Sequence, residues 1–243
     1  MDSIPFPAYL PCMTRPFILR LLPLVFCGIL TLPSPFLKAQ DAESILQTAR
    51  MNPTTHSAVL QAQIRGENTT LPLTIRLKDG VVRYEFTAPD QAIILKLSPT
   101  ETELGEEING TTKPISPSHR HDPIRNTGIS YQDLSLGFLY WPHPVIQSEE
   151  TIATRSAWKI DLQAPASEPL YGVARVWIDK ENGAIIKMEG FDKKGLLLRR
   201  FEVISIQQID GLYMLKQMRI ESFAPGNSHD VLSRNYLEIL GKR

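Results

Sequence analysis

"YGVARVWIDKENGAIIKMEGFDKKGLLLRRFEVISIQQI", Tyr171–Ile209, is the stretch that decides the fold class. It contains three apolar-rich segments separated by two short polar turns, Lys180–Gly183 and Lys193–Gly195. Short turns that contain glycine, placed between such segments, are typical of β-hairpins. Connections of this length leave no room for crossover helices, so the sequence predicts an antiparallel sheet.

The same hairpin pattern extends through the rest of the chain. An Asp210–Gly211 turn leads into two further strand-like segments, and an Asp79–Gly80 turn joins two alternating segments in the N-terminal half. The segment 100–108, "TETELGEEI", is polar and is predicted to be an edge strand. Residues 108–128 contain three prolines and are predicted to form a long loop. The pattern predicts about 11–12 strands, with no internal repeat.

Two short segments have the spacing of a helix. In Asp41–Arg50, apolar residues recur on one face, and Asp41 is a candidate cap of the first turn. In "SYQDL", Ser130–Leu134, the candidate cap is Ser130, with Asp133 three residues later. The fold class is therefore predicted to be mainly β with a small helical part, an α+β domain.

Residues 1–39 have the composition of a secretory signal. Arg15 and Arg20 precede the apolar run Leu21–Leu32, which is followed by prolines and a small residue. The run is too short for a transmembrane helix, which needs roughly 20 apolar residues. We predict export to the periplasm, with cleavage near Ala39–Gln40.

The predicted cleavage leaves a single domain over residues 40–243, and Met13 is an alternative start of the signal. Phe26 is bulky where a lipid-attachment signal has a small residue, which argues against a lipid anchor at Cys27. Cys12 and Cys27 both lie in the removed segment, so we expect no disulfide and no zinc–thiolate site in the mature domain.

Composition and spacing argue against several function classes. The 26 basic residues balance the 26 acidic residues, whereas a nucleic-acid binder needs a basic excess. His119 and His121 lack the spacing of a helical metal pair and are interpreted as solvated loop residues. The pairs Glu106–Glu107 and Glu149–Glu150 would point to opposite faces of a strand. We therefore expect no enzyme activity, no metal site and no cofactor.

Three stretches resemble a known family. "RYEFTAPDQAIIL" (Arg83–Leu95) resembles the strand–Pro–strand element of outer-membrane lipoprotein carrier proteins. "GISYQDL" (Gly128–Leu134) resembles the Ser-Tyr-Glu-Asp-Leu element of LolA-like lipoprotein-sorting proteins. The block Val176–Val203 resembles their strand–Asp–turn–strand–Asp-x-x-Gly–strand pattern. Over most of residues 41–240 the chain thus resembles the LolA-like lipoprotein carrier superfamily.

The resemblance implies a curved, half-open antiparallel β-barrel, with an N-terminal helix and a short lid helix on its concave face. In this family, lipid acyl chains bind between the sheet and the helices. The polar segment 100–108 departs from the family, which carries an aromatic dipeptide on the strand after the pair Ile93–Ile94. Arg76 and Arg83 are the candidate counterparts of the arginine that tethers the lid in the family.

The apolar run Phe138–Trp141 allows three interpretations: ordinary core packing, a lipid-facing lid, or a patch that docks a partner. The lid interpretation follows from the resemblance, because the run coincides with the moving helix of the family. The candidate lid residues are Tyr131, Leu134, Phe138 and Trp141. The candidate lining residues of the lipid cavity are Trp158, Ile160, Leu162, Val176, Ile178 and Ile93.

The leading hypothesis is a periplasmic, non-enzymatic carrier or binder of lipid or lipoprotein acyl chains, involved in outer-membrane lipoprotein sorting. An inner- or outer-membrane sorting component would be a further partner. Burying an acyl chain gains about 0.8 kcal/mol per methylene, so apolar area alone could hold a lipid without a charged anchor. The alternative is a periplasmic signalling or scaffold domain of the same fold that binds a protein partner, and an exported hydrolase is a third option.

Overall fold

The computed structural model describes residues 35–243. Residues 1–34, which include most of the predicted signal together with Cys12, Met13 and Cys27, lie outside the described residues. The described residues form one compact unit. None of the helices within residues 35–243 is both long enough and apolar enough to cross a membrane.

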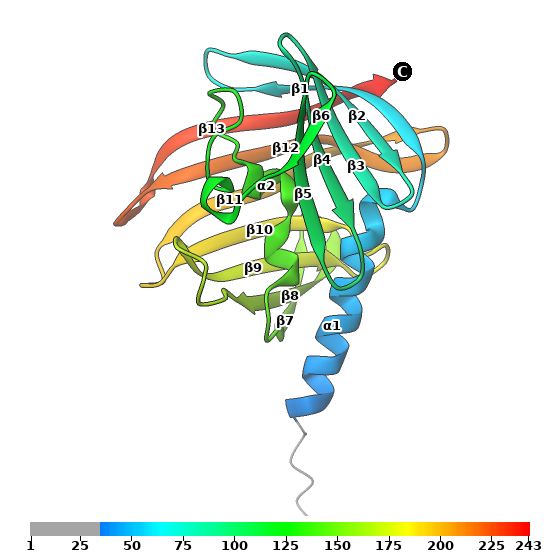
Figure 1. Ribbon diagram of the computed structural model, residues 1–243. Coiled ribbons are helices and arrows are strands. Elements are labelled where there is room, and N and C mark those ends of the chain that lie inside the picture. Colours follow the sequence, from blue (N-terminus) through cyan, green and yellow to red (C-terminus); the bar gives the residue numbers. More distant parts are fainter. Residues whose placement is uncertain (1–34) are drawn as a thin grey trace, which may run out of the picture. The chain divides into compact units, whose positions relative to one another are not determined.

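Within this unit, thirteen strands form one antiparallel sheet (Figure 1). Their order across the sheet is β6-β5-β4-β3-β2-β1-β13-β12-β11-β10-β9-β8-β7. In chain order the strands are β1 (Ala58–Arg65), β2 (Thr70–Lys78), β3 (Val81–Thr87), β4 (Asp90–Leu97), β5 (Thr102–Ile108), β6 (Thr111–Pro114), β7 (Val145–Ile152), β8 (Arg155–Gln163), β9 (Tyr171–Asp179), β10 (Ile185–Asp192), β11 (Leu197–Ile209), β12 (Leu212–Ala224) and β13 (Asn227–Lys242).

The sheet consists of two meanders joined at one seam. The first meander runs from β1 in the middle of the sheet to β6 at one edge, and the second runs from β7 at the other edge back to β13. The last strand, β13, pairs with the first strand, β1. Because β6 and β7 do not pair, the sheet stays open, which confirms the predicted mainly β, curved and half-open barrel.

The connection from β6 to β7, residues 115–144, must cross from one edge of the sheet to the other. It contains the 3-10 turn η2 (Pro117–His119), the short helix α2 (Tyr131–Ser135) and the 3-10 turn η3 (Gly137–Tyr140). Figure 1 shows this green segment in front of β10 and β11, with the strands curving around it. The predicted lid helix therefore lies over the concave face.

The hairpin predictions are confirmed and the edge prediction is wrong. Asp79–Gly80 and Asp210–Gly211 form turns in which both residues have positive φ, as a type I′ turn requires. Asn109–Gly110 forms a third such turn and pairs β5 with β6. The edge strand is thus β6, inside the predicted loop 108–128, whereas β5 pairs on both sides. This strand makes the total 13 rather than 11–12.

The N-terminal helix α1 (Pro35–Met51) begins earlier than predicted, so Asp41 is not its first-turn cap. A proline fits the first helical position, because its fixed φ suits a helix and its missing N–H would have no partner there. The helix gives way to the 3-10 turn η1 (Asn52–Thr54), where Pro53 lacks the backbone N–H that a continuing helix would need. The buried face of α1 consists of Ala42, Leu46, Ala49 and Arg50.

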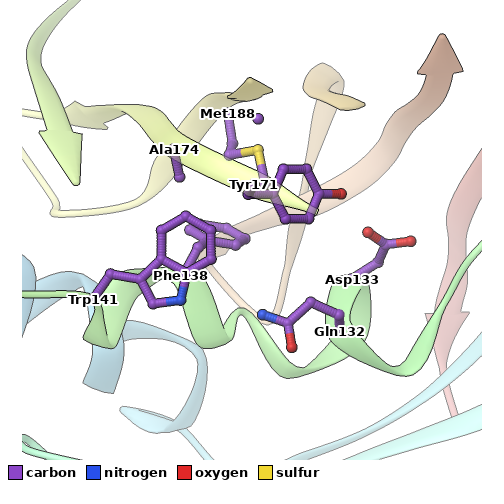
Figure 2. A pocket seen from close by; sticks show the side chains of 8 residues that line it. Gln132, Asp133, Phe138, Trp141, Tyr171, Ala174 and Met188 are labelled. Atoms are coloured by element: carbon purple, nitrogen blue, oxygen red, sulfur yellow. The ribbon is translucent and has the colours of Figure 1, made fainter. Parts of the chain in front are cut away.

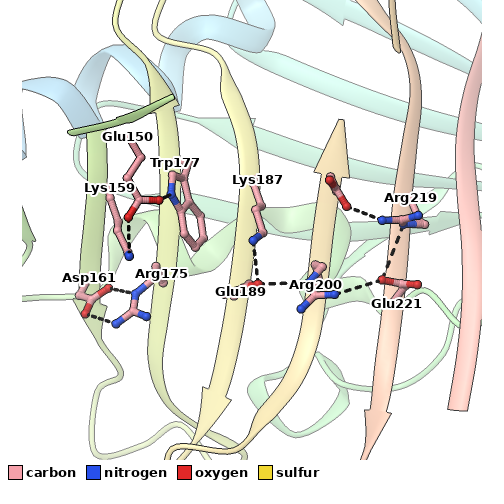
Figure 3. Close-up of polar contacts among 11 residues, drawn as sticks. Glu150, Lys159, Asp161, Arg175, Trp177, Lys187, Glu189, Arg200, Arg219 and Glu221 are labelled. Atoms are coloured by element: carbon pink, nitrogen blue, oxygen red, sulfur yellow. Dashed lines mark hydrogen bonds and ion pairs between the residues drawn. The ribbon is translucent and has the colours of Figure 1, made fainter. Parts of the chain in front are cut away.

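The outer face of the second meander is covered by a row of ion pairs, shown in Figure 3. Between β8 and β9, the charged residues on this face alternate with the buried core residues. Trp177 also lies here, and its indole N–H donates to Glu150 at 2.8 Å. The pairs are Lys159–Glu150 (2.7 Å), Arg175–Asp161 (2.7 Å), Lys187–Glu189 (2.9 Å), Arg200–Glu189 (3.1 Å) and Arg200–Glu221 (3.7 Å).

Glu238 on β13 holds the seam between the two meanders together. Its carboxylate accepts hydrogen bonds from Arg65 and Gln63 of β1 and from Gln217 of β12, each at 2.7 Å. The hydrogen bond from Arg65, helped by the two amides, lowers the pKa of Glu238 from 4.5 to about 2 against the opposing effect of its partial burial. The ionised carboxylate therefore stabilises the seam.

We predict that acid weakens the fold through Glu238. Its pKa is lower in the folded chain than in the unfolded chain, so its contribution is complete above about pH 5 and is lost as the pH falls toward about 2. Between these limits, the wild type should lose roughly 1–2 kcal/mol more free energy of unfolding than Glu238→Gln. Denaturant unfolding at several pH values measures this difference.

The matched control is Glu103→Gln, because Glu103 forms an exposed pair with Lys96 at 3.0 Å. This variant should keep the acid sensitivity of the wild type. Equal acid sensitivity in Glu238→Gln and the wild type would contradict the assigned role of Glu238.

Candidate functional site

The candidate site is the contact between the concave face of the sheet and the segment Ser130–Trp141, which we call the lid segment. It consists of Ser130, α2, Leu136, η3 and Trp141. Leu136 has a left-handed backbone with φ of 49°, which ends α2 and redirects the chain into η3. The lid segment is thus two short helical turns joined by a sharp bend.

The start of the lid segment is fixed locally, as the sequence predicts. Ser130 Oγ accepts a hydrogen bond from the Asp133 backbone N–H at 3.2 Å. Asp133 Oδ2 in turn accepts one from the Ser130 backbone N–H at 2.7 Å. This reciprocal capping box satisfies two backbone donors that the first turn leaves without helical partners.

The predicted lining residues lie in the hydrophobic core. Trp158 alone is half-buried, and the Lys180 ammonium lies 4.0 Å from its ring centroid. The other five are completely buried and belong to one core cluster: Ile93, Ile160, Leu162, Val176 and Ile178. The structure therefore places them together on β4, β8 and β9, and their contact with lipid stays a prediction.

Three of the four predicted lid residues are buried in the same cluster, namely Leu134, Phe138 and Trp141. Phe138 lies against Phe201 of β11, with ring centroids 6.1 Å apart. Trp141 lies 6.0 Å from Tyr171 of β9. The lid segment thus covers the concave face with its own apolar side chains.

The fourth, Tyr131, is half-buried and faces the other meander. Its hydroxyl donates to Glu106 of β5 at 2.7 Å. Burial, followed by the Glu106 hydrogen bond, raises the pKa of Tyr131 to about 12. Tyr131 therefore acts as a polar link between the lid segment and β5.

The space between the lid segment and the sheet is almost filled. A cavity of about 10 Å³ remains, enough for about one water molecule. Figure 2 shows the residues around it: Gln132, Asp133, Phe138, Trp141, Tyr171, Ala174, Met188 and Gly190. Core packing describes this closed arrangement, and an acyl chain could enter only if the lid segment moved.

Arg50 of α1 ties the lid segment to the first meander. Its guanidinium is 4% exposed and donates twice to the backbone oxygen of Leu139, at 2.8 and 3.1 Å. It also donates to the backbone oxygen of Pro99 at 2.6 Å and pairs with Glu43. The same guanidinium lies 4.8 Å from the Tyr140 ring centroid. One buried cation therefore joins α1, the β4–β5 turn and η3.

Arg199 of β11 ties the lid segment to the second meander. Its Nη2 lies 2.9 Å from Asp133 Oδ2, and its Nη1 donates to the backbone oxygen of Gly128 at 3.0 Å. The Tyr171 hydroxyl also interacts with this guanidinium, and burial raises the pKa of Tyr171 to about 12. Side chains of both meanders thus hold the lid segment closed.

The prediction that Arg76 or Arg83 tethers the lid is wrong. Both pair across the outer face, Arg76 with Glu85 at 2.8 Å and Arg83 with Glu107 at 2.6 Å. Glu85 of β3 and Glu107 of β5 thus hold these two guanidiniums on the outer face, away from the lid segment. The sequence did carry a signal for Arg50, which follows Leu46 by four residues and so falls on the buried stripe of α1.

The two neighbouring histidines engage separate carboxylates. His119 contacts Asp122 at 2.7 Å in the exposed loop, whereas His121 contacts the buried Glu168 at 3.0 Å. Across residues 35–243, no cluster of three or more metal-ligating side chains is found.

A family model with the description "-like: Uncharacterized protein" matches residues 109–236. These 128 positions are more than half of the 243 residues, so the chain belongs to that family. The match covers the lid segment and most of the second meander. A comparison with curated proteins gives no match.

Solved structures share the fold. A domain from Vibrio parahaemolyticus described as outer membrane lipoprotein-sorting has a TM-score of 0.66 and 16% identity, covering 84% of this chain and 92% of that chain. A DUF1329 family protein from Desulfovibrio piger has a TM-score of 0.59 and 14% identity, covering 83% and 91%. A LolA superfamily protein from Nitrosomonas europaea has a TM-score of 0.55 and 18% identity, covering 82% and 90%. The predicted LolA-like fold is thereby confirmed.

We predict that Arg50→Met loosens the lid segment. The variant loses the two hydrogen bonds to Leu139 and leaves a buried carbonyl oxygen without its donor, which should cost roughly 1–3 kcal/mol of unfolding free energy. Amide hydrogen exchange in Tyr131–Trp141 should become faster than in the wild type. Arg76→Met, which removes an outer-face arginine, should leave exchange in this segment unchanged, and unchanged exchange in Arg50→Met would refute the tether.

Proposed function

We propose that this chain is an exported, non-catalytic carrier that binds lipid or lipoprotein acyl chains between the concave face and the lid segment. The observation that carries the proposal is the lid segment itself, because it covers a continuous apolar wall with only a few apolar side chains and a few polar links. The cavity lining would be Trp158, Ile160, Leu162, Val176, Ile178 and Ile93, as the sequence predicts.

The energetics of such binding are an exchange. Each buried methylene of an acyl chain gains about 0.8 kcal/mol, but the chain must first displace the side chains of Leu134, Phe138 and Trp141 from the same wall. Net affinity is therefore the difference between two apolar contacts, less the cost of breaking the polar links of the lid segment. A small difference suits a carrier, which has to release its cargo as well as bind it.

The periplasm is the proposed location. The signal-like composition of residues 1–39 supports export, and the Vibrio parahaemolyticus neighbour, which shares the fold, is described as sorting lipoproteins of the outer membrane. A role in lipoprotein sorting would require a membrane component that delivers or receives the cargo.

A second candidate function is protein binding by the outer face. Ile204, Ile206, Tyr213 and Leu240 are exposed at one end of β11, β12 and β13, and the strand pairing puts Ile206 and Tyr213 on the same face. Exposed apolar groups of this kind are typical of interaction sites. Recovery of one membrane protein partner in a pull-down, together with blank lipid assays, would favour this function over lipid transport.

The carrier proposal predicts that the purified chain binds palmitate and displaces a hydrophobic fluorophore when it does so. Native mass spectrometry of protein purified from the periplasm should also detect bound lipid. Blank results in both assays would refute acyl-chain binding.

We further predict that Phe138→Ala makes loading faster. Removing this ring empties part of the wall that the lid segment occupies, so an acyl chain displaces less packing when it enters. The variant should lose about 3–5 kcal/mol of unfolding free energy and bind the fluorophore faster than the wild type. Tyr213→Ala is the control, since Tyr213 is 74% exposed and lies outside the core cluster. Slower fluorophore binding in Phe138→Ala would contradict the proposal that an acyl chain displaces the side chains of the lid segment.

A further inference from the structure

Arg199 is a cation placed among apolar residues of the concave face. On β11 it lies two residues before the buried Phe201, and its strand register aligns it with Gly190 of β10 and then Ala174 of β9. By contrast, the next residue, Arg200, points outward and pairs with Glu189. The Arg199 side chain is 13% exposed, and its partner Asp133 is 2% exposed.

The small cavity beneath the lid segment has an apolar end and a polar end. In Figure 2, Phe138 and Trp141 lie at one end, whereas the Asp133 carboxylate and the Tyr171 hydroxyl lie together at the other. Gly190 makes this arrangement fit, because a Cβ there would lie 2.7 Å from Cε1 of Tyr171. The site thus matches an amphipathic lipid, because a polar, charged end lies next to an apolar end.

Opening the lid segment would separate Arg199 from its carboxylate. Asp133 and Gly128, whose oxygens contact the guanidinium, belong to the lid segment and to the residues just before it. Removing one partner of a buried ion pair is strongly unfavourable, because the remaining charge is left uncompensated. A ligand that brings its own anionic group would remove this penalty, and a neutral ligand would not.

We propose that Arg199 binds the anionic head group of the acyl ligand, which takes the place of the Asp133 carboxylate when the lid segment opens. The ligand class is an acyl chain with a carboxylate or phosphate head. This inference rests on the proposed carrier function and replaces the expectation that apolar area alone holds the lipid. An arginine suits the role, because its planar fork donates two parallel hydrogen bonds to a carboxylate or a phosphate.

Tyr171 would supply a further donor. With its pKa raised to about 12 by burial, the phenol stays protonated at neutral pH and can donate to an anion. Its ring also contacts Trp141, so the same side chain lies at the junction of the polar and apolar ends.

The test compares ligands that share one chain and differ in the head group. Palmitate and palmitoyl lysophosphatidic acid carry an anionic head, whereas palmityl alcohol and methyl palmitate are neutral. Competition with a hydrophobic fluorophore should give the better anion an affinity at least about tenfold higher than that of the neutral compounds. Which anion binds better distinguishes a fatty acid cargo from a phospholipid cargo.

Three variants assign the preference to Arg199. Arg199→Met should reduce the preference to about twofold or less, while Arg200→Met, the same change one residue along on the outer face, should keep it. Asp133→Asn keeps the shape of the capping residue and frees Arg199, so palmitate should bind this variant more tightly and raise its Tm by more than in the wild type. The Asp133→Asn arm decides the question even if Arg199→Met fails to fold.

The outcomes separate this inference from the carrier function. The head-group site is refuted, and the carrier function stands, if all four compounds bind with equal affinity. The same holds if palmitate binds Asp133→Asn no more tightly than it binds the wild type. If none of them binds, both are refuted.

Discussion

The positions of the two edge strands determine the path of the connection that carries the candidate site. Because β6 and β7 lie at opposite edges of one open sheet, the connection between them has to cross the concave face. A segment that crosses an apolar face must be apolar on the side that contacts the sheet. This requirement accounts for the buried Phe138 and Trp141 in the connection. The lid segment is therefore a product of the strand order, and its apolar character follows without any ligand.

Polar contacts from both meanders hold the lid segment in place. Arg50 of α1 joins it to the β4–β5 turn of the first meander, and Arg199 reaches it from β11 in the second. The two differ in kind, because Arg50 donates mainly to backbone oxygens whereas Arg199 faces the side-chain carboxylate of Asp133. In the proposed carrier, the Asp133 carboxylate is the contact that an anion of the ligand could replace.

The sequence predicts what depends on neighbours along the chain. Asp79–Gly80 and Asp210–Gly211 are local turn signals, and the Ser130 capping box is closed within four residues, so these features were found correctly. The edge strand β6 was missed because its four exposed residues carry no apolar alternation. The role of Arg199 and the filled space under the lid segment arise from residues far apart in sequence, and no local pattern contains them.

The pairing of β1 with β13 has a consequence for how the chain reaches this form. Leu60 pairs with Lys242, so the first strand acquires its second neighbour only when nearly the whole polypeptide has emerged. Contacts between such distant residues form late and slow the search for the native arrangement. Until then β1 presents a bare edge to which other chains can add, so a newly made molecule is most prone to aggregate just before β13 is available.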